Sequence, residues 1–247
     1  MPGELRLFSD PGLASRTLAA EIASVIRSRA ASRLPGPVLG LPTGGTPLLL
    51  YQELARLHRE EGLSFVTVCA FNLDEYWPAP LGSSFRDFMA QHFYSQVDLP
   101  PSQAHILNGA VEASEVEKEC ARFEERIRLA GGLDLAVLGI GTNGHVAFNE
   151  PGSAPDSRTR RVRLAPDTRA RAAQAQPSWA ACAEALTMGV GTILEARRIV
   201  VMAFGAAKAE AVQRALRGPE SAECPASFLR RHPQVEWLLD PAAAAGL

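Results

Sequence analysis

The sequence predicts an α/β protein in which an open, mostly parallel sheet is covered by helices on both faces. Three observations lead to this prediction. Short apolar runs alternate with longer amphipathic runs, which is typical of repeated strand–helix units. The short runs contain few polar residues, as expected for strands that are buried on both faces. A glycine-rich or polar loop follows four of these runs, at the edge where parallel strands end.

The elements are expected in the following order. Apolar runs predict strands at residues 37–41, 65–71, 133–140, 197–204 and 235–239. Amphipathic runs predict helices at residues 13–33, 47–60, 84–96, 114–130, 178–195 and 206–217. Ser9 and Asp10 are candidate caps ahead of Pro11, and Thr46 is a candidate cap ahead of Pro47. No Pro/Gly/Ser-rich tract or block of charge divides the chain, so we expect one domain over residues 1–247.

The composition excludes several classes of protein. Hydrophobic residues make up 47% of the chain, yet no apolar run reaches the roughly 18 residues of a membrane span. The start lacks the segments of a secretory signal, so we expect a cytoplasmic protein without a membrane partner. A formal charge of −2 indicates no nucleic-acid partner. The four cysteines stand singly, without the spacing of a metal site, and no metal is expected.

Two loops are candidate anion sites. The loop "PTGGTP" places Thr43, Gly44, Gly45 and Thr46 before a predicted helix, whose free N–H groups and dipole favour a phosphate. Lys208 stands at the matching position after the fourth strand. Each loop alone also fits a plainer structure, namely an ordinary strand–helix turn and a solvated surface lysine. The first loop matches neither glycine pattern that binds nucleotides, so a nucleotide is not indicated.

Two further loops carry candidate acid–base groups. Asp74 and Glu75 follow the second strand, and either carboxylate can act as a general base if burial raises its pKa. A turn aspartate or a surface pair is the alternative. The third loop adds His145 and Glu150, and a carboxylate near an imidazole fixes its tautomer and stabilises its cationic form. Because these loops leave one sheet edge, we expect them to share one pocket.

Five segments together resemble the glucosamine-6-phosphate deaminase (isomerase) family over nearly the whole chain: "GLPTGGTP", "FNLDEY", "GIGTNGHVAFNEP", "ALTMGVGTIL" and "GAAKAEAV". The resemblance implies a modified Rossmann-like fold and conversion of glucosamine 6-phosphate to fructose 6-phosphate and ammonia without a cofactor. It implies that Asp74 moves a proton from C2 to C1 through an enolamine-like intermediate. It also implies that His145, supported by Glu150 and Asn143, opens the pyranose ring, and that the "TGGT" loop and Lys208 hold the phosphate.

The chain departs from the family pattern in three places. Some members carry aspartate at the position of Asn143, but an asparagine can still orient His145 by hydrogen bonding. Members typically have a phosphate-binding arginine on a mobile lid, expected here at residues 163–187. This chain has Gln174 at that position, with Arg169 or Arg171 as candidate substitutes. The chain also ends soon after "VEWLLDPAAAAGL", without the tail of hexameric, allosterically activated members, so we expect a monomer or small homo-oligomer.

Two alternatives stay open. A 6-phosphogluconolactonase shares the glycine loop, but it is expected to have "DGHTASLFP"-like residues and "DER" where this chain has "GHVAFNEP" and "DEY". A non-catalytic sugar-phosphate sensor of related fold usually carries an added helix-turn-helix. The first 36 residues supply only one amphipathic helix with no basic face. The motifs do not distinguish glucosamine from galactosamine 6-phosphate, which differ at one stereocentre.

Overall fold

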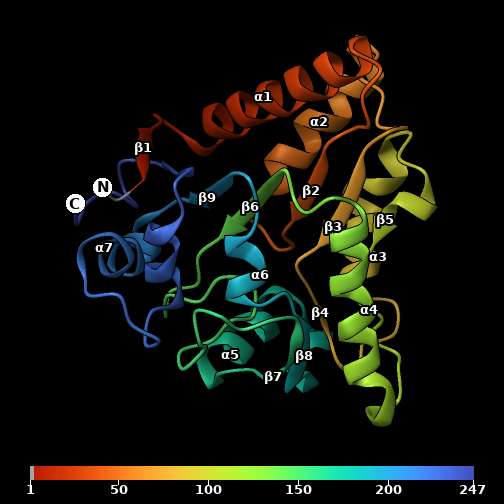
Figure 1. Ribbon diagram of the computed structural model, residues 1–247. Coiled ribbons are helices and arrows are strands. Elements are labelled where there is room, and N and C mark those ends of the chain that lie inside the picture. Colours follow the sequence, from red (N-terminus) through yellow and green to blue (C-terminus); the bar gives the residue numbers. More distant parts are fainter. Residues whose placement is uncertain (1–2) are drawn as a thin grey trace.

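The structure is a computed structural model that describes residues 3–247, and its centre is a seven-stranded parallel sheet (Figure 1). The strands lie side by side in the order β1-β10-β9-β6-β2-β3-β5. The predicted open parallel sheet is confirmed. The strand bounds are β1 Glu4–Leu7, β2 Val38–Leu41, β3 Cys69–Asn72, β5 Ala104–His105, β6 Leu135–Gly139, β9 Ile199–Ala203 and β10 Val235–Leu239.

Helices cover both faces of this sheet, as predicted. Helices α1, α2 and α3 contribute to one apolar core, and α4, α6 and α7 contribute to the other. Among residues 3–247, no helix is long and apolar enough to cross a membrane. The helix bounds are α1 Pro11–Ala31, α2 Leu48–Glu61, α3 Phe85–His92, α4 Val116–Leu129, α5 Pro166–Ala175, α6 Val190–Leu194 and α7 Ala209–Arg217.

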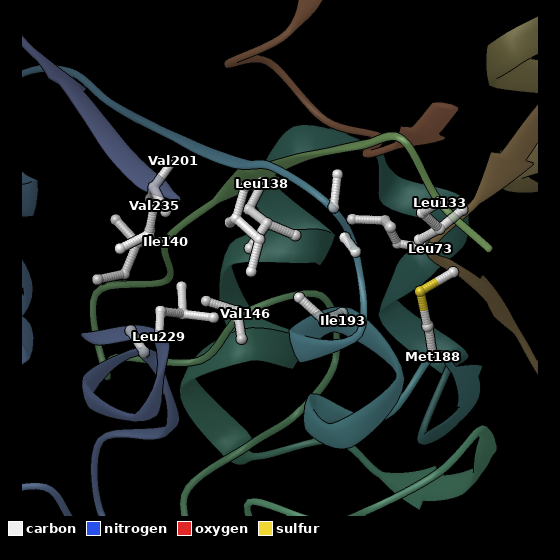
Figure 2. Close-up of a cluster of buried hydrophobic side chains, with 14 of the residues drawn as sticks. Leu73, Leu133, Leu138, Ile140, Val146, Met188, Ile193, Val201, Leu229 and Val235 are labelled. Atoms are coloured by element: carbon white, nitrogen blue, oxygen red, sulfur yellow. The ribbon is translucent and has the colours of Figure 1, made fainter. Parts of the chain in front are cut away.

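Alternate side chains of each central strand enter opposite cores. In β9, Val200 and Met202 pack on one face, while Ile199 and Val201 pack on the other. Figure 2 shows the second core, where Leu138 of β6 lies among side chains from several loops and helices. Fully burying one such side chain contributes about 1.5–3 kcal/mol. Burial on both faces explains why these strands are apolar throughout rather than alternating with polar residues.

The helix boundaries follow local signals in part. Asp10 caps α1 as predicted, since its side chain accepts a hydrogen bond from the Leu13 N–H at 2.8 Å, and Pro11 opens the helix. The prediction for α2 was wrong. Its cap is Pro47, with no side-chain hydrogen bond, so Thr46 does not cap the helix and Pro47 is not its first residue. No side chain of the loop before α2 therefore caps the N-terminus of this helix.

A second, smaller sheet was not predicted. It is antiparallel, in the order β4-β8-β7, and consists of β4 Asp74–Tyr76, β8 Glu184–Thr187 and β7 Arg160–Arg163. The predicted helix at residues 178–195 was wrong, because this stretch divides into the end of a 3₁₀ helix (Pro177–Ala181), strand β8 and helix α6. Strand β8 pairs on both sides, so non-local pairing overrides the local helical pattern.

Other elements differ from the predictions at their ends. The strand predicted at 65–71 begins at Cys69, because a turn closed by the Val68 N–H and the Phe65 carbonyl precedes it. The helices predicted at 84–96 and 206–217 each include a 3₁₀ turn, at Tyr94–Gln96 and Ala206–Lys208. Helix α5 and strands β1 and β5 were not predicted.

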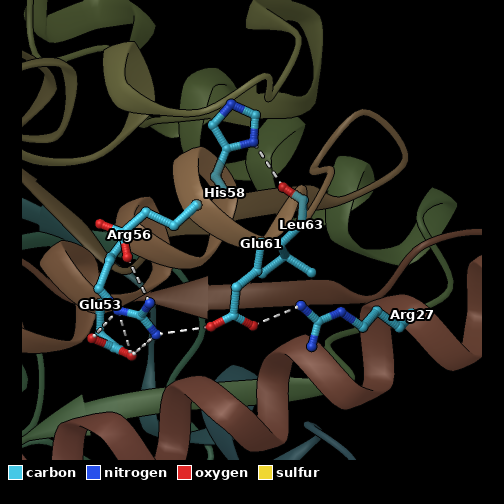
Figure 3. A network of polar contacts seen from close by, with 7 residues as sticks. Arg27, Glu53, Arg56, His58, Glu61 and Leu63 are labelled. Carbon is cyan, nitrogen blue, oxygen red and sulfur yellow. Dashed lines mark hydrogen bonds and ion pairs between the residues drawn. The ribbon is translucent and has the colours of Figure 1, made fainter.

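A surface ion-pair network joins α1 to α2. Arg56 contacts Glu53, Glu60 and Glu61, and Glu61 also contacts Arg27 of α1 at 3.2 Å (Figure 3). These groups are largely solvated, so their attraction is screened and adds little to stability. The network lies on helix surfaces and takes no part in the cavity described next.

Candidate active site

The predicted loops meet in one cavity of about 250 Å³ at the carboxyl edge of the sheet. The chain reverses its direction of strand addition between β2 and β6, which lie side by side, and loops diverging from such a switch point leave a crevice. Both of these loops line the cavity. The lining also includes residues of β4 and α5, together with Lys208. The complete lining consists of Pro42, Thr43, Gly44, Gly45, Thr46, Asp74, Tyr76, Phe85, Gly139, Ile140, Gly141, Thr142, His145, Ala147, Phe148, Thr168, Arg171, Ala172, Ala175 and Lys208.

A larger hollow of about 440 Å³ shares Gly44 and Gly45 with this cavity. It is lined by residues of the loop before α3, by α3 itself and by the segment after α5. None of the predicted acid–base side chains lines it, so the smaller cavity is the candidate active site.

Asp74 is a buried carboxylate in this cavity. Burial and, to a smaller extent, the neighbouring Glu75 raise its pKa to about 8, although the Thr43 side chain acts in the opposite direction. The Oδ1 atom of Asp74 has no hydrogen-bond partner among residues 3–247, so its negative charge is poorly stabilised. A carboxylate with such a pKa can accept a proton from a weak carbon acid and return it near neutral pH.

Glu75, the other carboxylate that the sequence offered as a general base, is instead bound by backbone N–H groups. Its carboxylate accepts hydrogen bonds from the N–H groups of Tyr76, Phe85 and Arg86 at 2.8–2.9 Å. The last two open helix α3, where a negative charge is also favoured by the helix dipole. Successive side chains of a strand point to opposite faces, so Asp74 faces the cavity while Glu75 faces α3.

His145 and Glu150 form the expected couple. The Nδ1 atom of His145 lies 3.4 Å from Oε2 of Glu150, and His145 also lines the cavity. Asn143 joins them, because its Nδ2 donates to Glu150 at 2.8 Å while its Oδ1 accepts from the His145 backbone N–H at 3.1 Å. Burial alone would raise the pKa of Glu150, but hydrogen bonds from His145, Thr168 and Asn143 lower it below its ordinary value. The couple therefore holds a carboxylate that is ionised at neutral pH.

Gly141 makes room for this imidazole. A Cβ atom at that position would lie 2.4–2.5 Å from three atoms of the His145 ring. The Gly141 N–H also donates to the His145 carbonyl at 2.9 Å, which closes the loop. Gly139, only two residues earlier, has open space around the same position. Gly141 is thus required by packing rather than by backbone conformation.

The opposite side of the cavity carries two cations. Lys208 donates to the Ile140 carbonyl at 2.7 Å, and burial followed by repulsion from Arg171 lowers its pKa. Among residues 3–247, no carboxylate forms an ion pair with either cation. Lys208 and Arg171 line the same cavity as Gly44 and Gly45, and two cations without a carboxylate partner can hold an anion there.

The candidate lid residues differ in their position relative to the cavity. All three are exposed, but Arg171 lines the cavity and Arg169 and Gln174 do not. Sequence reasoning missed Thr168, whose hydroxyl lies 3.4 Å from Nδ1 of His145. It also missed Tyr76, Phe85 and Phe148, whose rings pack together beside the cavity with centroids 4.7–5.7 Å apart. The sequence signal for Thr168, Tyr76 and Phe148 was their position near candidate site residues, and Phe85 had no such signal.

No group of three or more His, Cys, Asp or Glu side chains within the described part of the chain is arranged to hold a metal ion. The four cysteines are free thiols. The charged and ionisable groups in or beside the cavity include a carboxylate, an imidazole–carboxylate couple and two cations.

Comparison with known proteins connects this geometry to one family. Residues 9–237 match the family described as glucosamine-6-phosphate isomerases/6-phosphogluconolactonase. The chain is 46% identical to glucosamine-6-phosphate deaminase 1 of Giardia intestinalis, over 94% of this chain and 85% of that protein. It is 44% identical to the glucosamine-6-phosphate deaminase of Bacillus velezensis, over 92% of this chain and 94% of that protein.

Solved structures agree with this match. A monomeric glucosamine-6-phosphate deaminase superposes with a TM-score of 0.92 at 38% identity, covering 99% of this chain and 100% of the other. The 6-phosphogluconolactonase of Trypanosoma brucei superposes with a TM-score of 0.78 at 21% identity, covering 99% and 98%. At that identity, the second likeness shows a common fold alone.

Proposed function

Because the chain belongs to the glucosamine-6-phosphate isomerase/6-phosphogluconolactonase family, we propose that it converts glucosamine 6-phosphate to fructose 6-phosphate and ammonia. The observation that most strongly supports this proposal is that Asp74, His145 and Lys208 line one cavity of about 250 Å³. This reaction needs a base beside two adjacent carbons, a second acid–base group for ring opening, and a phosphate site. The cavity contains a candidate for each.

In this proposal, Asp74 takes the proton from C2 of the open-chain sugar and delivers it to C1. The C2–H bond breaks, an enolamine forms, and protonation at C1 leaves an imine at C2. Water then adds to C2 and ammonia leaves, so the net reaction is hydrolysis of a carbon–nitrogen bond and we assign the enzyme to the hydrolases. The raised pKa of Asp74, about 8, supports this role, because the same group must both accept and return a proton.

His145 opens the pyranose ring by moving a proton between the anomeric hydroxyl and the ring oxygen. Glu150 lies beside Nδ1 of the imidazole, so the opposite nitrogen is left to meet the sugar. Asn143 holds both partners through the two hydrogen bonds of its amide. An asparagine thus orients the couple without adding a second negative charge.

The phosphate binds between the loop Thr43–Thr46 and the two cations Lys208 and Arg171. Backbone N–H groups near Gly44 and Gly45 approach it closely, since neither glycine has a neighbour where a side chain would lie. Arg171 replaces the arginine that the family typically carries at the position of Gln174. Binding energy from this remote group positions C2 against Asp74.

We further propose that residues 166–181, within the expected lid at 163–187, form its moving part. Strand β8, at the end of the expected lid, is paired on both sides and is held in the small sheet. Thr168 is the one buried residue of α5. We also propose a single domain acting as a cytoplasmic monomer or small homo-oligomer, which is supported by the likeness to a solved monomeric deaminase.

The test is to incubate the purified protein with glucosamine 6-phosphate and measure both ammonia and fructose 6-phosphate. Equal amounts of both products are expected, with no hydrolysis of 6-phosphogluconolactone. Arg171→Ala should raise KM about tenfold or more, because a charge-assisted contact to phosphate is lost. The matched control is Arg169→Ala, which removes an arginine from the other face of the same helix. This variant should leave KM within about twofold. Lactone hydrolysis without ammonia would reject the proposal. The same assay with galactosamine 6-phosphate shows whether the enzyme distinguishes the two sugars, which differ at one stereocentre.

A further inference from the structure

The N-terminus of helix α5 lies against the His145–Glu150 couple. The N–H of Ala165, the residue that precedes the helix, donates to Oε1 of Glu150 at 3.3 Å. Two residues into the first turn, the Thr168 hydroxyl lies 3.4 Å from Nδ1 of His145. This hydroxyl also helps to lower the pKa of Glu150. Helix α5 therefore supplies two of the contacts that keep Glu150 ionised and turned toward the imidazole.

The same helix carries the arginine that faces the phosphate site. Thr168 and Arg171 are three residues apart, so they lie on the same face of α5, and both line the cavity. Thr168 contacts the couple on one side, and Arg171 faces Lys208 on the other. A rigid displacement of α5 would move both side chains together.

Few contacts hold α5 in this position. Thr168 is 8% exposed and is the one buried residue among the ten of the helix. Beyond the helix, the segment is fastened by Trp179, whose Nε1 donates to the Ser83 carbonyl at 2.6 Å. Elements with little buried apolar surface open locally at low cost in free energy, so a ligand can shift the position of α5.

We propose that α5 couples phosphate binding to ring opening, with Thr168 as a positioning residue for the His145–Glu150 couple. The phosphate attracts Arg171, which holds α5 in its docked position, and docking places the Thr168 hydroxyl and the Ala165 N–H on Glu150. A sugar that lacks the phosphate would leave the couple less well oriented. The proposal rests on the function proposed above, and it adds a role for a residue outside the acid–base set.

The first experiment compares Thr168→Val with Thr168→Ser. Valine keeps the shape of threonine and removes its hydroxyl, whereas serine keeps the hydroxyl. We expect Thr168→Val to lower kcat on glucosamine 6-phosphate about tenfold with KM within about twofold, and Thr168→Ser to retain at least about half of kcat. If Thr168 acts only through packing, Thr168→Ser, which loses a methyl group, should lose more activity than Thr168→Val, which keeps the shape of threonine.

A second readout separates ring opening from proton transfer at carbon. Washout of tritium from C1 of fructose 6-phosphate, with ammonium present, requires Asp74 but no opening of a pyranose ring. This rate should stay within about twofold of wild type in Thr168→Val. If washout falls as far as turnover of glucosamine 6-phosphate, Thr168 does not act through the couple and the proposal is wrong.

Coupling itself is tested with inorganic phosphate and a double-mutant cycle. Phosphate alone should shift the His145 ring resonances in NMR spectra of the wild type, and Arg171→Gln should abolish that shift. Thr168→Val should cost less in the Arg171→Gln background than in the wild type, since α5 is already released there. Additive effects, or no response of His145 to phosphate, would overturn the coupling. Either result can be distinguished from failure of the proposed function, because in that case the wild type itself would release no ammonia.

Discussion

Replacing Asp74 by asparagine should abolish turnover and at the same time stabilise the protein at alkaline pH. The reason is the burial of this carboxylate, which raises its pKa from 3.8 to about 8. In the unfolded chain Asp74 is ionised above about pH 4, whereas the folded protein keeps it protonated up to about pH 8. The folded state therefore holds an extra proton across this window, and its stability falls as the pH rises through it.

The magnitude follows from the same values. Each tenfold change in proton affinity corresponds to about 1.4 kcal/mol. Between pH 5 and pH 8, the wild type should therefore lose up to about 4 kcal/mol that Asp74→Asn does not lose. Relaxation around the ionised carboxylate reduces this figure, so a difference of about 2–4 kcal/mol is expected. Other groups titrate in both proteins and cancel in the comparison.

The assay is urea denaturation of both proteins at several pH values between 5 and 9. The stability advantage of Asp74→Asn should grow with pH and level off near pH 8, while its ammonia release stays at background. The exposed Asp156→Asn is the matched control, and its stability difference should stay within about 0.5 kcal/mol at every pH. A pH-independent difference for Asp74→Asn, or a variant that is less stable than wild type at pH 9, would refute the reasoning.

The wild-type enzyme should show a kcat that rises with pH toward a midpoint near 8, because only ionised Asp74 accepts a proton; a flat profile from pH 6 to 9 would argue against this base. Gly141→Ala should reduce kcat about tenfold or more, since the new Cβ would lie 2.4 Å from the His145 ring, and an unchanged kcat in the ammonia-release assay would contradict this reasoning. Glu75→Ala should lower the free energy of unfolding by about 2–3 kcal/mol in urea, because two buried N–H groups and one half-buried N–H group lose their acceptor, and an unchanged value would contradict its capping role. Trp179→Phe should raise hydrogen exchange of the α5 amides about fivefold through loss of one hydrogen bond of about 1 kcal/mol, and unchanged exchange would show that this bond does not hold the segment.

Much of the fold could be predicted from the sequence because its signals are local. An apolar run with a glycine-rich loop at its end predicts a buried parallel strand regardless of its partners, and all five predicted strands are present. The convergence of Asp74, His145 and Lys208 also follows from local signals, since the carboxyl ends of parallel strands share one edge. The small sheet carries no such signal, because β4 and β8 pair across more than one hundred residues of intervening chain.

The sequence by itself determined which kinds of group meet at the sheet edge: a carboxylate, an imidazole–carboxylate couple, an anion loop and a lysine. Only the tertiary structure decided which carboxylate faces the cavity, because the position of α3 turns Glu75 into a cap and leaves Asp74 buried without a partner for Oδ1. It also decided that Arg171, and not Arg169 or Gln174, lines the cavity together with Lys208. The direction of a helical side chain depends on how the helix docks, and the contacts that dock α5 come from distant parts of the chain.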